Sequence, residues 1–349
     1  MKQIFTRSPN NPILKPNPEN QWESHKVYNC GALFDNGEYH LFYRAMSKNW
    51  VSKIGYAKSL DGESYTRFKN PALYSQNNSY SMEDPRIVKV DNQYFLTYTK
   101  YDGLFVTLNL TTTKNLKEWE DRGPMIPDWN LKKAGGFLVP WDPAQVKAES
   151  NSEAAKKWCK AGAIFPETIG GKYWMLFGDR NIWLASSHDG IVWEPVWNPF
   201  IKARSKNYFD EKHVEMGPPP IKTNKGWLVL YHGVTSKIEY KIGLLLLDIN
   251  DPTKILYRSN EPIFEPQETY ELSGIVDILP GGYEAMQKMS KDELEVFIND
   301  AESKGTMPKV VFCCGAVLAN DILRIYYGAS DSVICTATAK LADILALVP

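Results

Sequence analysis

The stretch NGEYHLFY (36–43) recurs in altered form as DNQYFLTY (91–98), GGKYWMLF (170–177), NKGWLVLY (224–231) and NDILRIYY (320–327). Each copy is a turn signal followed by a β-rich run that ends in an aromatic residue. A short apolar segment such as GALF (31–34) precedes each copy, and another such as KIGYAKS (53–59) follows it. Short antiparallel strands repeated five times predict an all-β fold, a five-bladed β-propeller. An array of β-sandwiches is the alternative, and the equal repeats disfavour it.

The repeats are not evenly spaced along the chain. Two longer spacings predict insertions with short helices near 131–160 and 282–308, and the second holds a capping-box signal at Ser290 and Glu293. These insertions are either lids or decoration. We expect one catalytic propeller domain over residues 1–349. The N-terminal arm, 10–22, is expected to pair with the last blade or to wrap around the outside.

Composition restricts the classes of function. The formal net charge is -1 and no basic block is present, so neither nucleic acid nor an anionic membrane is the expected partner. The five cysteines form no CxxC pair, and we find no metal-binding or cofactor-binding motif. No apolar segment has the length of a signal peptide or a membrane span, so we expect a cytoplasmic protein. The 11 Trp and 19 Tyr fit either an aromatic core or a carbohydrate cleft.

The segment SMEDPRIV (81–88) carries the first candidate for chemistry. Pro85 disfavours the α region for Asp84, so we expect Asp84 on a rigid, extended entry to a strand. With Arg86 nearby, such a carboxylate suits a proton donor or a ligand for sugar hydroxyls. The alternative is an ordinary strand-entry Asp that accepts backbone hydrogen bonds.

Polar residues recur at two equivalent points of the repeats. The residues ahead of the repeat segments are Asn29, Asp84, Glu167 and Glu215, and those at or after the closing aromatics are Arg44, Lys100, Asp102, Asp179, Arg180, Tyr231, His232 and Asp331. Equivalent positions of all blades converge on one end of the central channel, so these residues are expected to line one funnel. His232 could instead be a core histidine and Arg44 a surface partner of Glu38, while Asp61 and Asp189 are best read as hairpin turns.

These residues resemble glycoside hydrolase family 130, the β-mannoside hydrolases and phosphorylases. The markers are Tyr28-Asn29 with Phe42-Tyr43-Arg44, Glu83-Asp84-Pro85-Arg86, Ala163-Ile164-Phe165-Pro166, Tyr231-His232-Gly233 and Tyr326-Tyr327-Gly328-Ala329 with Asp331. The resemblance implies a five-bladed propeller that acts on β-linked mannose oligosaccharides with inversion. It implies that Asp84 is the catalytic acid, acting through the mannose 3-hydroxyl, and that Asn29, Arg44 and Asp331 hold the terminal mannose. Arg86, Lys100, Asp102, Asp179, Arg180, Tyr231 and His232 are added as substrate-binding candidates.

The nucleophile divides this family. Phosphorylases carry arginines near the third blade, where this chain has Lys160 and Glu167, and a basic residue where it has Glu215. Two carboxylates repel phosphate and suit water, so the sequence favours an inverting, exo-acting β-1,2-mannosidase in which Glu167 and Glu215 share the base role. Arg180, with Lys160 and His232, keeps open a phosphorylase that produces mannose 1-phosphate. A sugar-binding propeller without catalysis is the third possibility, and the sequence leaves the oligomeric state open.

Overall fold

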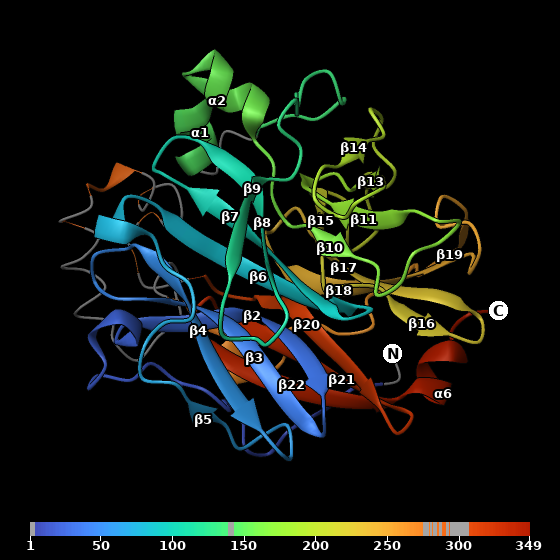
Figure 1. Cartoon of the computed structure of the whole chain (residues 1–349), viewed down its shortest axis with the longest axis horizontal. Helices are drawn as coiled ribbons and strands as arrows, with labels where there is room; N and C mark the ends of the chain where they lie inside the picture. Colours follow the sequence, from blue (N-terminus) through green and yellow to red (C-terminus); the bar gives the residue numbers. More distant parts are fainter. Residues whose placement is uncertain are drawn as a thin grey trace.

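Five β-sheets form a ring around a central axis in the computed structural model (Figure 1). The structure describes residues 4–138, 143–274, 279, 281, 285, 288–290, 293 and 307–349. Four sheets have four strands each and the fifth has six. The five-bladed β-propeller predicted from the repeats is therefore confirmed.

Each blade is built from consecutive antiparallel strands. Blade 1 contains β2 (Lys26–Asp35), β3 (Glu38–Met46), β4 (Ser52–Ser59) and β5 (Thr66–Arg67). Blade 2 contains β6 (Ser81–Val90), β7 (Gln93–Tyr101), β8 (Val106–Thr113) and β9 (Glu120–Pro124). Blade 3 contains β10 (Ala163–Ile164), β11 (Tyr173–Phe177), β13 (Trp183–Ser187) and β14 (Glu194–Pro195).

The last two blades carry additions. Blade 4 contains β15 (His213–Met216), β17 (Gly226–Val234), β18 (Tyr240–Leu247) and β19 (Ile255–Arg258), with β12 (Asp179–Arg180) paired to β15 and β16 (Ile221–Thr223) paired to β17. Blade 5 contains β20 (Val311–Ala319), β21 (Ile322–Ala329), β22 (Val333–Lys340) and β1 (Thr6–Arg7). The described helices are η1 (Gln21–Glu23), η2 (Gln76–Asn78), α1 (Pro143–Glu149), α2 (Ser152–Lys157), α3 (Thr269–Leu272) and α6 (Leu341–Leu345).

The N-terminal arm closes the ring. Thr6 and Arg7 pair with Ala337 and Thr338 of β22, and Leu14 forms a further bridge with Ile334. The bridge at Leu14 confirms pairing with the last blade, one of the two arrangements predicted for the arm 10–22. The two chain ends are thereby joined in one sheet, which leaves the ring without a free seam.

The hydrophobic core lies between the blades. Five clusters of buried side chains occupy the five junctions between neighbouring blades, and the cluster between blades 2 and 3 also takes in side chains of the first insertion. The closing aromatics Tyr43, Tyr98, Phe177, Tyr231 and Tyr327 are all buried on the second strand of their blades. The repeated aromatic therefore builds these junctions rather than a sugar cleft.

The first strands of the blades approach one another closely near the axis. A Cβ on Gly31 would lie 2.9 Å from the carbonyl oxygen of Pro85, and one on Gly315 would lie 2.6 Å from that of Cys30. Glycine at these two positions lets the backbones of β2, β6 and β20 meet.

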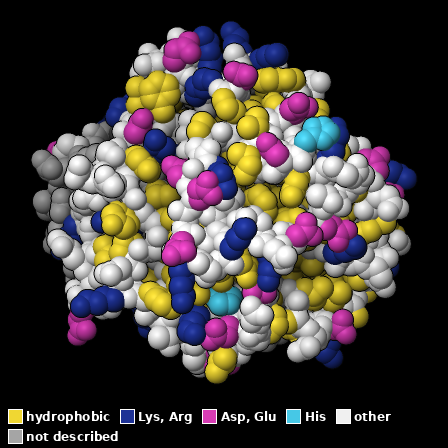
Figure 2. Space-filling view, in the orientation of Figure 1, with side chains coloured by type: hydrophobic (Ala, Val, Ile, Leu, Met, Phe, Trp, Pro, Cys, Tyr) yellow, Lys and Arg dark blue, Asp and Glu magenta, His cyan; other side chains and the backbone are white. Residues whose placement is uncertain are grey.

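The first insertion holds α1 and α2, as expected, and Figure 1 shows both helices beside β7 and β9. The predicted capping box is present, because Ser290 N donates to Glu293 Oε2 at 2.8 Å and Glu293 N donates to Ser290 Oγ at 3.3 Å. The rest of the second insertion, near 282–308, lies largely outside the described residues. Within the described part of the chain, we find no helix with the length and apolarity needed to span a bilayer. All five cysteines are buried and free. Figure 2 shows charges of both signs interspersed over one face.

Candidate active site

Two β-bulges aim polar side chains into the centre of the ring. The pairing of β2 with β3 shifts register between Tyr28 and Cys30, and that of β6 with β7 shifts between Glu83 and Arg86. At these shifts Asn29 has φ 45° and Asp84 has φ 49°. Asp84 was expected to be extended, and that prediction is wrong: its backbone is left-handed, a conformation that Asn and Asp tolerate better than other non-glycine residues. A bulge re-aims one side chain without ending the strand.

Four blades and the segment just ahead of blade 3 line one cavity of about 250 Å³. Its polar lining residues are Asn29 and Arg44 from blade 1, Asp84 from blade 2, Glu215 from blade 4 and Asp331 from blade 5, together with Lys160 just ahead of blade 3. Five of these six are candidates that the repeat alignment placed in one funnel. The structure thus brings them together although they are far apart in sequence.

Asp84 is held by a hydrogen-bond network. Its Oδ1 accepts from Asn29 Nδ2 at 2.9 Å and from Arg44 Nη1 at 3.2 Å, while Arg44 Nη2 donates to Glu83 at 2.7 Å. Arg44 is therefore a partner of Glu83 and Asp84, whereas Glu38 pairs with Lys58. Asn29 Oδ1 has no hydrogen-bond partner among the described residues and is buried against the backbone of blade 5. A Cβ on Gly328 would collide with that oxygen.

The carboxyls of the cavity differ in acidity. Burial raises the pKa of Asp84, but the positive charges of Arg44, Lys160 and Arg86 lower it more, so its pKa lies below the ordinary value. For Asp331, burial outweighs the nearby Arg44 and raises the pKa to about 6. Burial also raises the pKa of Glu215 by more than Lys160 lowers it.

Lys160, just ahead of blade 3, and Glu215 of blade 4 form what we call the nucleophile wall. Lys160 Nζ lies 3.2 Å from Glu215 Oε1. Burial lowers the pKa of Lys160, but the negative charges of Glu215, Asp179 and Asp84 raise it by more. The net pKa lies above the ordinary value, so the side chain is a charged ammonium. Asp179 and Arg180 are buried behind this wall, where β12 pairs with β15. Arg180 Nη1 lies 2.9 Å from His213 Nε2.

An apolar wall completes the cavity. Tyr240, Met307, Val310 and Phe312 line it, and the Phe312 ring stacks on His232 with centroids 4.1 Å apart. His232 itself is fully buried and accepts a hydrogen bond from Cys313 N at 2.8 Å. The structure therefore places His232 in the core, which is the alternative that the sequence left open.

Glu167 is not part of this site, contrary to prediction. Its side chain is 44% exposed and both carboxylate oxygens accept from Lys222 Nζ, at 2.6 and 2.8 Å. It follows β10, whereas Lys160 precedes it. Because a strand advances about 3.3 Å per residue, seven residues carry the chain from the cavity toward the other end of the channel. The expected sharing of the base role by Glu167 and Glu215 is therefore excluded by position.

Four other candidates also lie outside the lining. Arg86 is buried and donates to the carbonyls of Asp84, Met216 and Gly217, which joins blade 2 to blade 4. Tyr231 donates to Asp210 in the junction between blades 3 and 4. Lys100 lies over the ring of Tyr80 at 4.3 Å, and Asp102 caps a turn by accepting from two backbone amides.

Sequence reasoning missed the apolar wall and Tyr28. Tyr28 lies under the Arg44 guanidinium, 4.9 Å from ring centroid to Cζ. Its place beside Asn29 was a usable signal, whereas Met307 lies in the second insertion and carries no repeat pattern.

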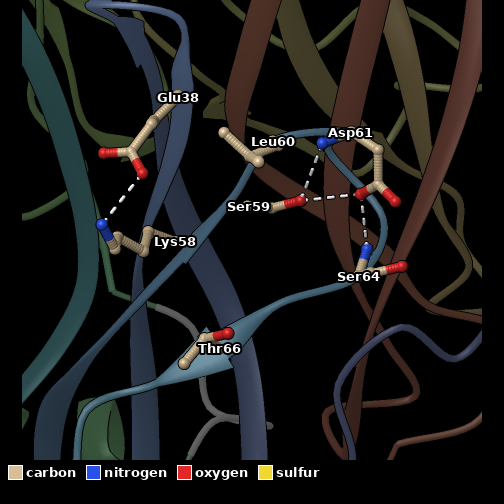
Figure 3. Close-up of a pocket in the computed structure, with 7 residues that line it drawn as sticks. All are labelled: Glu38, Lys58, Ser59, Leu60, Asp61, Ser64 and Thr66. Atoms are coloured by element: carbon tan, nitrogen blue, oxygen red, sulfur yellow. Dashed lines mark hydrogen bonds and ion pairs between the residues drawn. The ribbon is translucent and has the colours of Figure 1, made fainter.

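Figure 3 shows a different hollow, at the C-terminal end of β4. Its volume is about 380 Å³. Ser52, which accepts a hydrogen bond from Arg44 of the active-site cavity, lies at the other end of that strand. In the hollow, Asp61 Oδ1 accepts from Ser59 Oγ and from the backbone amide of Ser64 (Figure 3). The backbone amide of Glu63 donates to the same oxygen. Asp189 forms the same kind of turn with Ser187, Ile191 and Val192. Both aspartates are turn residues, as predicted.

Comparisons with known proteins agree with this architecture. The family model described as "beta-1,4-mannooligosaccharide phosphorylase", of glycoside hydrolase family 130, matches residues 5–292 and 294–349. A 1,2-beta-oligomannan phosphorylase from Thermoanaerobacter sp. (strain X514) is 32% identical, covering 95% of this chain and 96% of that protein. A beta-1,2-mannobiose phosphorylase from the same strain is 33% identical, covering 96% and 97%.

A solved structure from work on "glycoside hydrolases that target beta-1,2 mannosidic linkages" within the family of mannoside phosphorylases has a TM-score of 0.74 and 26% identity. It covers 96% of this chain and 93% of that one. The family model spans nearly the whole sequence, and the resemblance seen in the motifs is confirmed. The chain belongs to glycoside hydrolase family 130.

Proposed function

We propose that this protein is an inverting, exo-acting phosphorylase of β-1,2-linked mannose oligosaccharides, which releases mannose 1-phosphate. The observation that carries the choice of nucleophile is the ammonium of Lys160, which lines the cavity beside Glu215 in the nucleophile wall. The sequence favoured hydrolysis because two carboxylates were expected there. Because Glu167 lies outside the site, Glu215 is the one carboxyl of the nucleophile wall, and the Lys160 ammonium lies beside it.

Recognition of the sugar rests on the blade 1 and blade 5 side of the cavity. Asn29, Arg44 and Asp331 offer an amide, a guanidinium and a carboxyl, which suit the hydroxyls of a terminal mannose. A volume of about 250 Å³ is smaller than the pockets that hold drug-sized ligands, so it favours one sugar ring and hence exo action.

Asp84 is proposed as the general acid, through the mannose 3-hydroxyl. Its pKa lies below the ordinary value, so it needs a reason to hold a proton. Phosphate bound at Lys160 brings negative charge close to Asp84 and raises that pKa. Water brings no charge. The proton given to the leaving oxygen is returned to Asp84 by the attacking phosphate, so the cycle is balanced.

Glu215 then assists phosphate instead of excluding it. Its pKa is already raised by burial, and the phosphate charge raises it further. A protonated Glu215 donates a hydrogen bond to a phosphate oxygen, while Lys160 supplies the positive charge. The activities named for the two curated relatives support the same reaction and the same linkage.

The test is incubation with β-1,2-mannobiose with and without inorganic phosphate. We expect turnover that requires phosphate and yields mannose 1-phosphate plus mannose. Mannose as the only product, at a rate independent of phosphate, would contradict phosphorolysis. Binding of the sugar without turnover in either condition would point to a sugar-binding propeller.

Hydrolysis is the second candidate, and Glu215 is the observation that favours it. A buried carboxylate in the same cavity as Asp84 has the place of a base that activates water. A structural neighbour from work on β-1,2-mannoside hydrolases supports the same reading. The phosphate experiment decides between the two.

A further inference from the structure

Helix α1 of the first insertion buries one polar side chain although much of the helix is exposed. Gln145 of α1 is 0% exposed, whereas its neighbours Val146 and Lys147 point to solvent. Its Nε2 donates to Asp179 Oδ2 at 3.1 Å, and its Oε1 accepts from Arg180 Nε at 3.4 Å. One amide therefore contacts both charged residues behind the nucleophile wall.

The same insertion holds the other oxygen of Asp179. Trp158, which follows α2, donates from Nε1 to Asp179 Oδ1 at 3.0 Å. A buried carboxylate needs partners for its oxygens, since an unsatisfied one carries a large desolvation cost. Gln145 and Trp158 supply one each, from opposite ends of the helical pair.

Asp179 and Arg180 are coupled to the nucleophile wall through the backbone. In the pairing of β12 with β15, Asp179 lies opposite Glu215. The residue before it, Gly178, donates from N to the carbonyl of Lys160 at 2.9 Å and accepts from Met216 N at 3.0 Å. A shift of this segment would therefore move both members of the wall.

Charge provides a second coupling. The negative charge of Asp179 lies close enough to Lys160 to raise the pKa of its ammonium. Arg180 has φ 71°, a left-handed conformation that is costly for a long side chain and persists only when its surroundings hold it. The Gln145 amide is one of the contacts that hold it.

We propose that Gln145 is a positioning residue for phosphate: by fixing Asp179 and Arg180 it sets the place and charge of Lys160 and Glu215. The first insertion is then a support of the nucleophile site rather than a lid or decoration. The inference rests on the proposed function, because the ligand concerned is the attacking phosphate.

The experiment compares Gln145→Met with Lys147→Met in the full chain. Gln145→Met keeps the length of the side chain and removes both hydrogen-bonding groups, and Lys147→Met makes the same replacement on the exposed side of the helix. The readouts are KM for phosphate, KM for β-1,2-mannobiose, and kcat in the phosphorolysis direction. Thermal melting and circular dichroism establish that each variant is folded.

We expect Gln145→Met to raise KM for phosphate about tenfold, equivalent to about 1.4 kcal/mol. KM for mannobiose should stay within about twofold, because the sugar-binding residues lie on other blades, and Lys147→Met should change neither. Trp158→Phe, which loses the N–H donated to Asp179, should act in the same direction as Gln145→Met and serves if that variant fails to fold.

Equal changes in both KM values, or no change in KM for phosphate, would overturn the inference while leaving phosphorolysis intact. A wild-type enzyme whose rate ignores phosphate would overturn the proposed function and this inference with it.

Discussion

Replacing Asp84 with Asn tests the proposed acid with little change in shape. The side chains are nearly isosteric, and Asn tolerates the left-handed backbone found at this bulge. The carbonyl oxygen of the introduced amide can still accept from Asn29, and Arg44 keeps its 2.7 Å contact with Glu83. The bulge and the cavity should therefore persist, and the variant should melt close to the wild-type temperature.

The expected loss follows from what the carboxyl supplies. General acid catalysis contributes about 10²- to 10⁴-fold, and each tenfold corresponds to about 1.36 kcal/mol of activation free energy. An amide at this position cannot donate a proton to the leaving oxygen or to a relay hydroxyl. We therefore expect kcat to fall by about 10²- to 10⁴-fold with KM for mannobiose changed little, because the lost interaction forms in the transition state.

The assay is initial-rate phosphorolysis of β-1,2-mannobiose, with an aryl β-mannoside as a second substrate. A good aryl leaving group needs little protonation, so the deficit of Asp84→Asn should be much smaller on that substrate. A variant that keeps more than about a tenth of wild-type kcat on mannobiose would refute the assignment of the acid. An equal deficit on both substrates would show that the residue acts in some other way.

Three further predictions concern other residues. Glu215→Gln should keep the rate of phosphorolysis within about tenfold of wild type, because an amide still donates to phosphate. In the wild type, ionisation of Glu215 at higher pH should repel phosphate and raise its KM, and this rise should be absent in the variant. Loss of all activity would favour the base role instead. Arg86→Met should lower the free energy of unfolding in urea by about 3–5 kcal/mol, since it leaves three buried carbonyls unpaired; unchanged stability with a raised KM would restore the predicted sugar contact. His232 has a pKa lowered by burial to about 3, so the unfolded chain takes up a proton below pH 6.5 that the folded one refuses; the contribution of His232 to stability should fall by about 3 kcal/mol between pH 6.5 and 4. In urea titrations His232→Gln should remove this part of the pH dependence, while His25 and His213, whose pKa values burial also lowers, keep theirs.

The repeat was enough to predict the fold. Turn residues, a β-rich run and a closing aromatic recur because every blade needs the same turn and the same buried ring at its junction, as Tyr43 and Tyr231 show. Equivalent positions in the repeats then predicted which side chains meet, and Asn29, Asp84 and Glu215 do line one cavity. Symmetry alone carries this information, because all blades present the same end to the axis.

The errors have a common physical cause. Aligning the repeats gives the approximate position of a residue along its strand. It does not give the face of the sheet on which the side chain lies, nor the local pairing register. Side chains alternate between faces, so Lys100 and Asp102 lie away from the cavity although they follow a closing aromatic as Arg44 does. Glu167 follows the short β10, whereas Lys160 precedes it, and counting back from the closing aromatic did not separate these two positions. The bulge at Asp84 depends on pairing with β7, which local sequence does not encode.

The central claim concerns the nucleophile, and the origin of the oxygen on mannose C1 tests it most directly. The enzyme is given β-1,2-mannobiose with ¹⁸O-labelled phosphate in unlabelled water, and the products are examined by mass spectrometry and NMR. We predict α-mannose 1-phosphate that retains every labelled oxygen of the phosphate, including the one bonded to C1. Free mannose whose new C1 oxygen comes from water, with the phosphate left unchanged, would contradict the account.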